Sequence, residues 1–153
     1  MLNPDYADML SAFVDHDVRF LVVGAYAMAG HGYLRATVDL DLWVEATPEN
    51  AQRVYDALVE FGAPADHFDE VDFTVEGMVL QVGVAPQRID ILTQISGVTF
   101  AEAWRHHAMG IVGDLEVPIL SREDLITNKR ATGRDKDMRD ARLLEEEAED
   151  DDL

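Results

Sequence analysis

The sequence predicts a mixed α/β domain, and three features of the chain support this expectation. Residues 18–23 form an apolar run typical of a central strand that is covered on both faces. Residues 38–44 place acidic side chains between apolar ones, which is the alternation of a second strand. Thr47-Pro48 is a strong helix start, because an N-cap threonine precedes a proline at the first helical position.

Hydrophobic spacing predicts three helices in the first half of the chain. Apolar side chains at helical spacing predict a helix over residues 4–16, with Val14 among its inward residues. Gly24 opens a short helix of small residues that permit close packing. The helix over residues 48–61 is expected to turn Val59 inward and to end at a glycine. These helices alternate with the strands, as expected for a mixed domain.

The second half predicts a hairpin and then further helices. Residues 73–75 and 78–84 resemble the two arms of a hairpin, and residues 88–92 predict a strand. The elements expected after these are a helix capped by Thr99, strands near residues 111–112 and 117–120, a helix begun by the capping-box pattern Ser121-Arg122-Glu123-Asp124, and a last helix from Asp135. We expect one domain over residues 1–144 and an acidic tail over residues 145–153.

Two aspartates on the second predicted strand are the first candidates for chemistry. Side chains alternate along a strand, so Asp39 and Asp41 point to the same face. Asp90 lies at the centre of the later strand over residues 88–92. Carboxylates held side by side repel one another, and no lysine lies nearby in the sequence. A divalent cation is therefore the first candidate for what holds them together.

Composition restricts the possible functions. The chain has no cysteine, which excludes disulfides, thiolate zinc sites and cysteine nucleophiles. The sequence contains no apolar run of membrane-spanning length and no signal segment, so we expect a cytoplasmic protein without a membrane partner. The formal net charge is -19, which disfavours unaided binding of long nucleic acids. Adaptation to high salt and attraction of a basic partner both remain open as reasons for this acidity.

The order of these motifs resembles the nucleotidyltransferase superfamily typified by DNA polymerase beta. The matching residues are Gly24-Ala25, a spacer of 13 residues, Asp39-Leu40-Asp41-Leu42 and the later Ile89-Asp90-Ile91. The lead-in Arg35-x-Thr37-x-Asp39 and the later Lys129…Gly133-Arg134-x-Lys136-Asp137…Asp140 are similar to small stand-alone bacterial and archaeal enzymes, which include minimal nucleotidyltransferases and abortive-infection toxins. Ala25 departs from the usual glycine or serine. The resemblance implies a nucleotidyltransferase fold with a mixed sheet, packed helices and C-terminal helices.

The resemblance also implies a site and a reaction. Asp39, Asp41 and Asp90 would be the catalytic residues and would hold two Mg²⁺ ions, with Asp90 also accepting the proton of the acceptor. The residues expected to contact the nucleotide are Gly24, Ala25, Arg35, Thr37 and Lys129. The implied reaction moves a nucleoside monophosphate from a nucleoside triphosphate to a hydroxyl of a small molecule, an RNA end or a protein.

Two other hypotheses stand beside the enzyme. The first is a non-catalytic component of a toxin–antitoxin-type complex, which keeps the fold and binds a helical partner protein. The second is a plain α/β scaffold with a fortuitous acid cluster, in which Asp39→Ala would stabilise the fold by relieving repulsion. Binding of Mg²⁺ and nucleotide distinguishes the enzyme from both.

Overall fold

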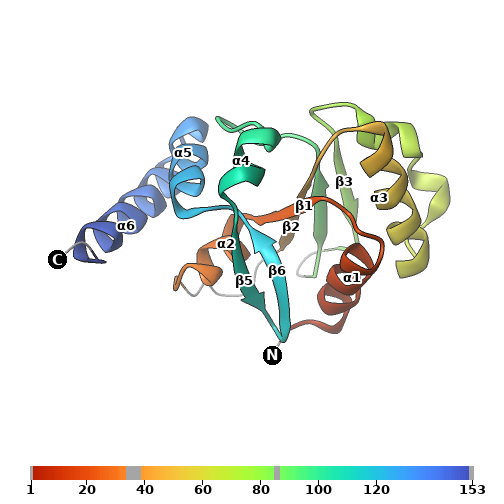
Figure 1. The fold of residues 1–153 in the computed structure, drawn as a ribbon, viewed down its shortest axis with the longest axis horizontal. Coiled ribbons are helices and arrows are strands. Elements are labelled where there is room, and N and C mark those ends of the chain that lie inside the picture. The colour runs from red at the N-terminus through yellow and green to blue at the C-terminus, as the bar shows by residue number, and fades with distance from the viewer. Residues whose placement is uncertain (1, 34–38, 85–86, 152–153) are drawn as a thin grey trace.

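A computed structural model describes residues 2–33, 39–84 and 87–151, with side chains described as far as residue 146 (Figure 1). Within these residues, a six-stranded mixed sheet has helices on both of its faces. The helices are α1 (Pro4–Asp15), α2 (Gly24–Gly30), α3 (Pro48–Phe61), α4 (Phe100–His106), α5 (Arg122–Thr132) and α6 (Asp135–Asp151). The strands are β1 (Phe20–Val23), β2 (Leu40–Val44), β3 (Val79–Val82), β4 (Ile89–Leu92), β5 (Ala108–Val112) and β6 (Leu115–Ile119). This architecture confirms the predicted fold class.

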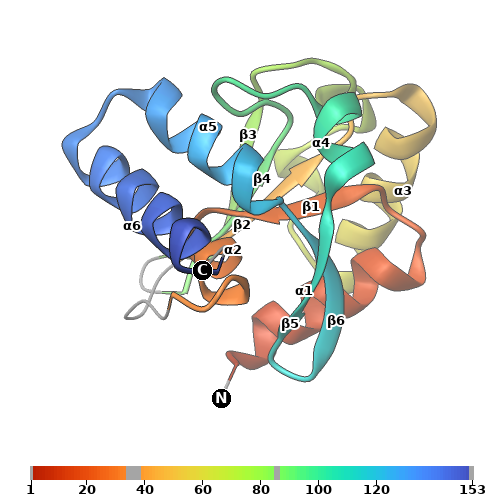
Figure 2. The same ribbon diagram turned by 60° about the vertical axis from the view of Figure 1, so that its left-hand side comes forward.

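The strand order determines which loops meet. The sheet runs β3-β4-β2-β1-β6-β5, so β1 and β2 lie at its centre. β1 is antiparallel to β2, and β2 is parallel to β4. The end of β1 therefore lies beside the beginnings of β2 and β4, at a single edge of the sheet (Figure 2).

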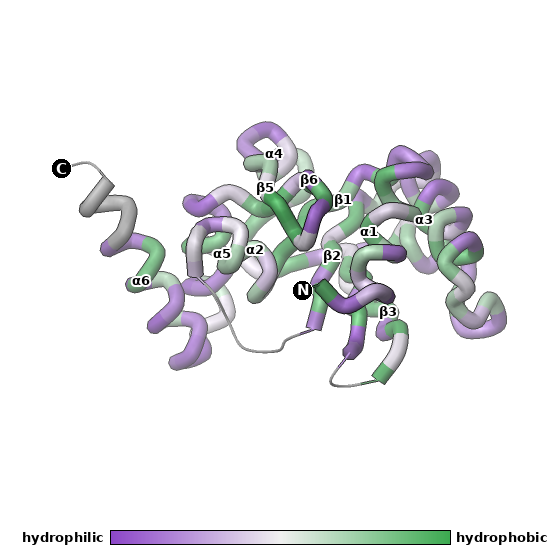
Figure 3. Tube along the Cα trace, turned by 90° about the horizontal axis from the view of Figure 1, so that it is seen from below, coloured by the Kyte–Doolittle hydropathy of each residue, from purple (hydrophilic) through white to green (hydrophobic). Residues whose placement is uncertain are grey.

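Two hydrophobic clusters cover the two faces of the sheet. On one face, α1 and α3 pack against the inward side chains of β1, β2 and β4, such as Val22, Leu42 and Ile91. On the other face, α2, α4, α5 and α6 pack around Leu21 and Trp43. Trp43 is 1% exposed and contacts Phe100 edge-to-face, so it is a core residue. The coloured part of α6 lies at one side of the molecule, away from β3 and α3 (Figure 3).

Three details of the sequence prediction were wrong. Residues 70–74 form a short 3₁₀ helix rather than a hairpin arm, because an Asp69–Asp72 capping box starts this helix and Phe73 packs into the core. β3 pairs with β4 instead. Val14 and Val59 are 46% and 48% exposed, because they lie at the margins of the packed faces of α1 and α3.

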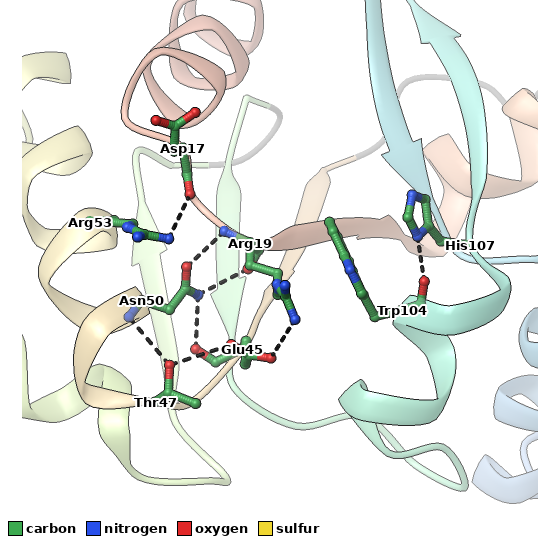
Figure 4. A network of polar contacts seen from close by, with 8 residues as sticks. All are labelled: Asp17, Arg19, Glu45, Thr47, Asn50, Arg53, Trp104 and His107. Carbon is green, nitrogen blue, oxygen red and sulfur yellow. Dashed lines mark hydrogen bonds and ion pairs between the residues drawn. The ribbon is translucent and has the colours of Figure 1, made fainter.

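The side chain of Asn50 joins α3 to the sheet (Figure 4). Its side chain accepts a hydrogen bond from the backbone N–H of Arg19 and donates to the carbonyls of Arg19 and Glu45. The buried amide thus joins the start of β1, the end of β2 and the first turn of α3. Among the described helices, none combines the length and apolarity that crossing a bilayer requires.

Candidate active site

The strands bring the predicted carboxylates together at one edge of the sheet. Asp41 lies opposite Asp90 in the parallel β2–β4 register, and opposite Val23 in the β1–β2 register. Side chains in register on neighbouring strands point to the same face. Asp39 immediately precedes β2 and completes the group. We call Asp39, Asp41 and Asp90 the carboxylate cluster.

Gly24 follows the end of β1 and lies against the Asp41 carboxylate of the cluster. Its φ angle is +66°, in the left-handed region that glycine adopts without strain. A β-carbon built at this position would collide with the Oδ2 atom of Asp41. The position therefore requires glycine both for its backbone angle and for the close approach of Asp41. Ala25 follows in the first turn of α2 and is partly buried.

Among the described residues, the cation in contact with the cluster is Arg88, which was not predicted from the sequence as a site residue. Arg88 Nη2 lies 2.9 Å from Asp39 Oδ2, and Arg88 Nε lies 3.0 Å from Asp90 Oδ1. The pattern Arg88-Ile89-Asp90 could have predicted this contact, because residues two apart on a strand share a face. The guanidinium of Arg88 therefore brings positive charge to Asp39 and Asp90.

One arginine does not neutralise three carboxylates. Burial, followed by the charges of Asp90 and Asp39, raises the pKa of Asp41 to about 7, although Arg88 and Lys129 oppose this rise. Burial also raises the pKa of Asp90, again against the effect of Arg88. Burial, then Tyr26 and the nearby carboxylates, raise the pKa of the Tyr6 phenol beneath the cluster. The site therefore favours a proton or a further cation.

Lys129 is buried by ion pairs to α6. Its Nζ lies 3.2 Å from Asp137 Oδ1 and 3.2 Å from Asp140 Oδ2, and its side chain is 12% exposed. Thr132 Oγ1 and Arg134 Nε donate to the other oxygen of Asp137. Burial alone would raise the pKa of Asp137, but these three partners lower it. Lys129 is thus held between the last two helices, with its positive charge acting on Asp41.

Replacing Lys129 with methionine should lower the free energy of unfolding by about 3 kcal/mol, because two buried aspartates lose their ammonium partner. Lys136→Met on exposed α6 surface is the matched control and should change stability by less than about 0.5 kcal/mol. Urea unfolding followed by circular dichroism measures both. Equal effects of the two substitutions would contradict the buried ion-pair network.

The donor set fits a divalent cation only in part. Carboxylate oxygens are the ligands that Mg²⁺ prefers. Asp90 Oδ1 is buried and forms an ion pair with Arg88 Nε at 3.0 Å, but no described residue donates a hydrogen bond to it. In the same part of the chain, no three acidic or histidine side chains are arranged as a ready metal cage. Arg88 contacts oxygens of both Asp39 and Asp90. The residues fit Mg²⁺ once those oxygens are released.

Two predicted nucleotide contacts lie outside the described residues, namely Arg35 and Thr37. His31, next to this gap, bonds through Nε2 to the carbonyl of Leu120 at 2.8 Å and so links α2 to the end of β6.

The fold is similar to that of solved nucleotidyltransferase structures. The structure aligns with a Thermotoga maritima protein that is assigned to the nucleotidyltransferases, at a TM-score of 0.59 and 14% identity over 98% of this chain and 96% of that one. It also aligns with ANT(2″)-Ia, solved in complex with adenylyl-2″-tobramycin, at a TM-score of 0.56 and 14% identity over 91% of this chain and 84% of that one. No family model matches the sequence, and no curated protein is detectably similar to it. The fold expected from the motifs is therefore confirmed.

Proposed function

We propose that the protein is a Mg²⁺-dependent nucleotidyltransferase that moves a nucleoside monophosphate from a nucleoside triphosphate to a hydroxyl acceptor. The observation that carries the proposal is the carboxylate cluster. Asp41 and Asp90 are in register on parallel strands, and Gly24 presses against Asp41 at the same edge of the sheet. A superfamily fold alone also hosts inactive proteins, so the cluster is the stronger support.

Each residue has a role that its environment supports. Asp39, Asp41 and Asp90 would hold Mg²⁺, which when bound supplies positive charge for the triphosphate and the attacking oxygen. Burial raises the pKa of Asp90, and a carboxylate of raised pKa is a better base for the proton of the acceptor hydroxyl. Gly24 and Ala25 would contact the phosphates through backbone N–H groups at the start of α2, since neither carries a large side chain.

Lys129 is the second cation of the site in this proposal. Asp137 and Asp140 hold its ammonium on the side of α6, and its charge already acts on Asp41. An ammonium fixed in this way can favour a triphosphate from a short distance without a direct contact in the free protein. Arg35 and Thr37 remain proposed nucleotide contacts.

The acidity of the chain favours a small molecule or a protein as acceptor. A formal net charge of -19 repels phosphate backbones, so an RNA end is the least favoured of the acceptors. The ligand in the ANT(2″)-Ia structure is an adenylylated small molecule, which is consistent with this order of preference.

A non-catalytic binding protein is the second candidate, and the Arg88 ion pairs favour it. Because Arg88 joins Asp39 to Asp90, part of the charge in the cluster is balanced without any metal. A protein that keeps this fold and acts by contacting a helical partner would need no more.

A thermal melt with Mg²⁺ and each of the four nucleoside triphosphates distinguishes the two candidates. For the enzyme we expect one nucleotide at about 100 times its Kd to stabilise the fold by ~2.7 kcal/mol, or roughly 5–10 °C. Asp39→Ala should lose this rise, whereas Asp8→Ala on the exposed side of α1 should keep it. No rise with any nucleotide in the unsubstituted protein would favour the binding protein.

A further inference from the structure

We propose that Arg88 and the divalent cation exchange places: the guanidinium holds Asp39 and Asp90 in the metal-free protein and leaves them when the cation binds. This inference rests on the proposed function, because it concerns the same cluster. It adds a residue that neither the motif pattern nor the comparisons assign.

The contacts show that the guanidinium and the cation need the same oxygens. Arg88 reaches Asp39 Oδ2 at 2.9 Å, Asp90 Oδ1 at 3.0 Å and Asp90 Oδ2 at 3.4 Å. These atoms belong to two of the three carboxylates that would bind Mg²⁺. A carboxylate oxygen already paired with a guanidinium is a weaker ligand, so binding of the cation has to break these ion pairs.

The backbone of Arg88 is held by hydrogen bonds, whereas its guanidinium can leave Asp39 and Asp90. Its carbonyl accepts hydrogen bonds from the Tyr6 hydroxyl at 3.1 Å and from the backbone N–H of Leu40 at 3.1 Å. The contacts that the described residues make with the guanidinium all come from Asp39 and Asp90, and the side chain is 33% exposed. The side chain of Arg88 can therefore turn into solvent while its backbone stays hydrogen-bonded, which leaves the sheet undisturbed.

Charge favours the exchange. Three carboxylates lie in the cluster, and a guanidinium brings one positive charge where a divalent cation brings two. The charge of Lys129 acts on Asp41 but does not neutralise the cluster, because its ammonium is paired with Asp137 and Asp140. Arg88 directly precedes β4, so the displaced guanidinium would remain near the cluster, where it could contact an anion.

Titration calorimetry with Mg²⁺ alone tests the exchange in wild type, Arg88→Gln and Arg88→Lys. Removing the competing ion pairs should tighten Mg²⁺ binding by about fivefold in Arg88→Gln, the equivalent of ~1 kcal/mol for partly exposed pairs. Arg88→Lys keeps the charge but cannot bridge two carboxylates with a planar fork, so its affinity should lie between the two. Arg53→Gln on α3, whose guanidinium contacts the carbonyl of Asp17, is the control for charge and should match wild type.

A spectroscopic measurement gives an independent readout. The NMR signal of the Arg88 guanidinium, assigned by its absence from Arg88→Lys, should shift on addition of Mg²⁺ to wild type. Equal Mg²⁺ affinities in wild type and Arg88→Lys, or weaker binding by Arg88→Gln, would overturn the exchange and leave the proposed function standing. If none of the proteins binds Mg²⁺, the proposed function fails and the exchange fails with it.

Discussion

Replacing Asp41 with asparagine should abolish the proposed nucleotidyl transfer and, at the same time, stabilise the protein above neutral pH when no metal is added. The transfer rate should fall roughly a thousandfold or more, because one essential charged group of the cluster is lost. The stabilisation arises because Asp41 is buried beside Asp90 and Asp39, which makes its charged form unfavourable. Asparagine has nearly the same shape and carries no charge.

The pH dependence of this effect follows from the sign of the shift. The pKa of Asp41 rises from 3.8 to about 7 on folding, so the folded protein retains a proton that the unfolded chain has lost. The free energy of unfolding therefore falls as pH rises from about 4 to about 7, by up to ~4 kcal/mol at roughly 1.4 kcal/mol per unit. In Asp41→Asn, the free energy of unfolding should not fall in this way, because asparagine does not titrate.

Melting temperatures measured without metal between pH 4 and pH 8 check the prediction. At pH 8 the variant should melt roughly 5–10 °C above wild type, and at pH 4 the two should coincide. Asp8→Asn, an exposed aspartate of α1, should follow wild type throughout. A lower melting temperature of Asp41→Asn at pH 8 would show that the Asp41 carboxylate stabilises the fold instead.

Gly24→Ala should lower the free energy of unfolding by about 4 kcal/mol and weaken nucleotide binding. Its φ of +66° is strained for alanine, and the new methyl group would collide with Asp41 Oδ2. Relief of the collision requires Asp41 to move away from Asp90, which disrupts the cluster as well as the turn.

Gly133→Ala separates the backbone effect from the collision. Gly133 ends α5 with a φ of +69°, close to that of Gly24, and a β-carbon there meets nothing within 4 Å. This control should lower stability by only ~1 kcal/mol. Urea unfolding of both variants measures the difference of about 3 kcal/mol that we attribute to the contact with Asp41. Equal effects of the two substitutions would mean that Asp41 can move away from the new methyl group without loss of stability.

Local rules of the sequence predicted much of the fold. The helix from Pro48 to Phe61 has the expected Thr47 cap, whose hydroxyl accepts from the N–H of Asn50, and it ends at Gly62 with a φ of +97°. The two-residue period of a strand placed Asp41 and Asp90 on the face away from Leu40 and Ile89. These features depend on residues within a few positions of one another, so the sequence contains them directly.

Pairings between distant segments could not be predicted in this way. The β3–β4 pairing replaced the expected hairpin because Phe73, on a 3₁₀ turn, packs against Phe68 in the core. That Lys129 contacts phosphate stays a prediction, and the sequence did not predict that Asp137 and Asp140 bind its ammonium. Which carboxylate a long side chain reaches depends on how two helices fold back on each other.

The sequence by itself therefore determined the α/β class, the glycine turn, Asp41 and Asp90 on their strands and Asp39 next to one, because backbone period and steric limits are local. Only the tertiary structure decided that Asp41 lies in register with Asp90 and that Arg88 joins Asp39 to Asp90. The physical reason is that charge balance in a buried cluster depends on distances between strands, and strand order sets those distances.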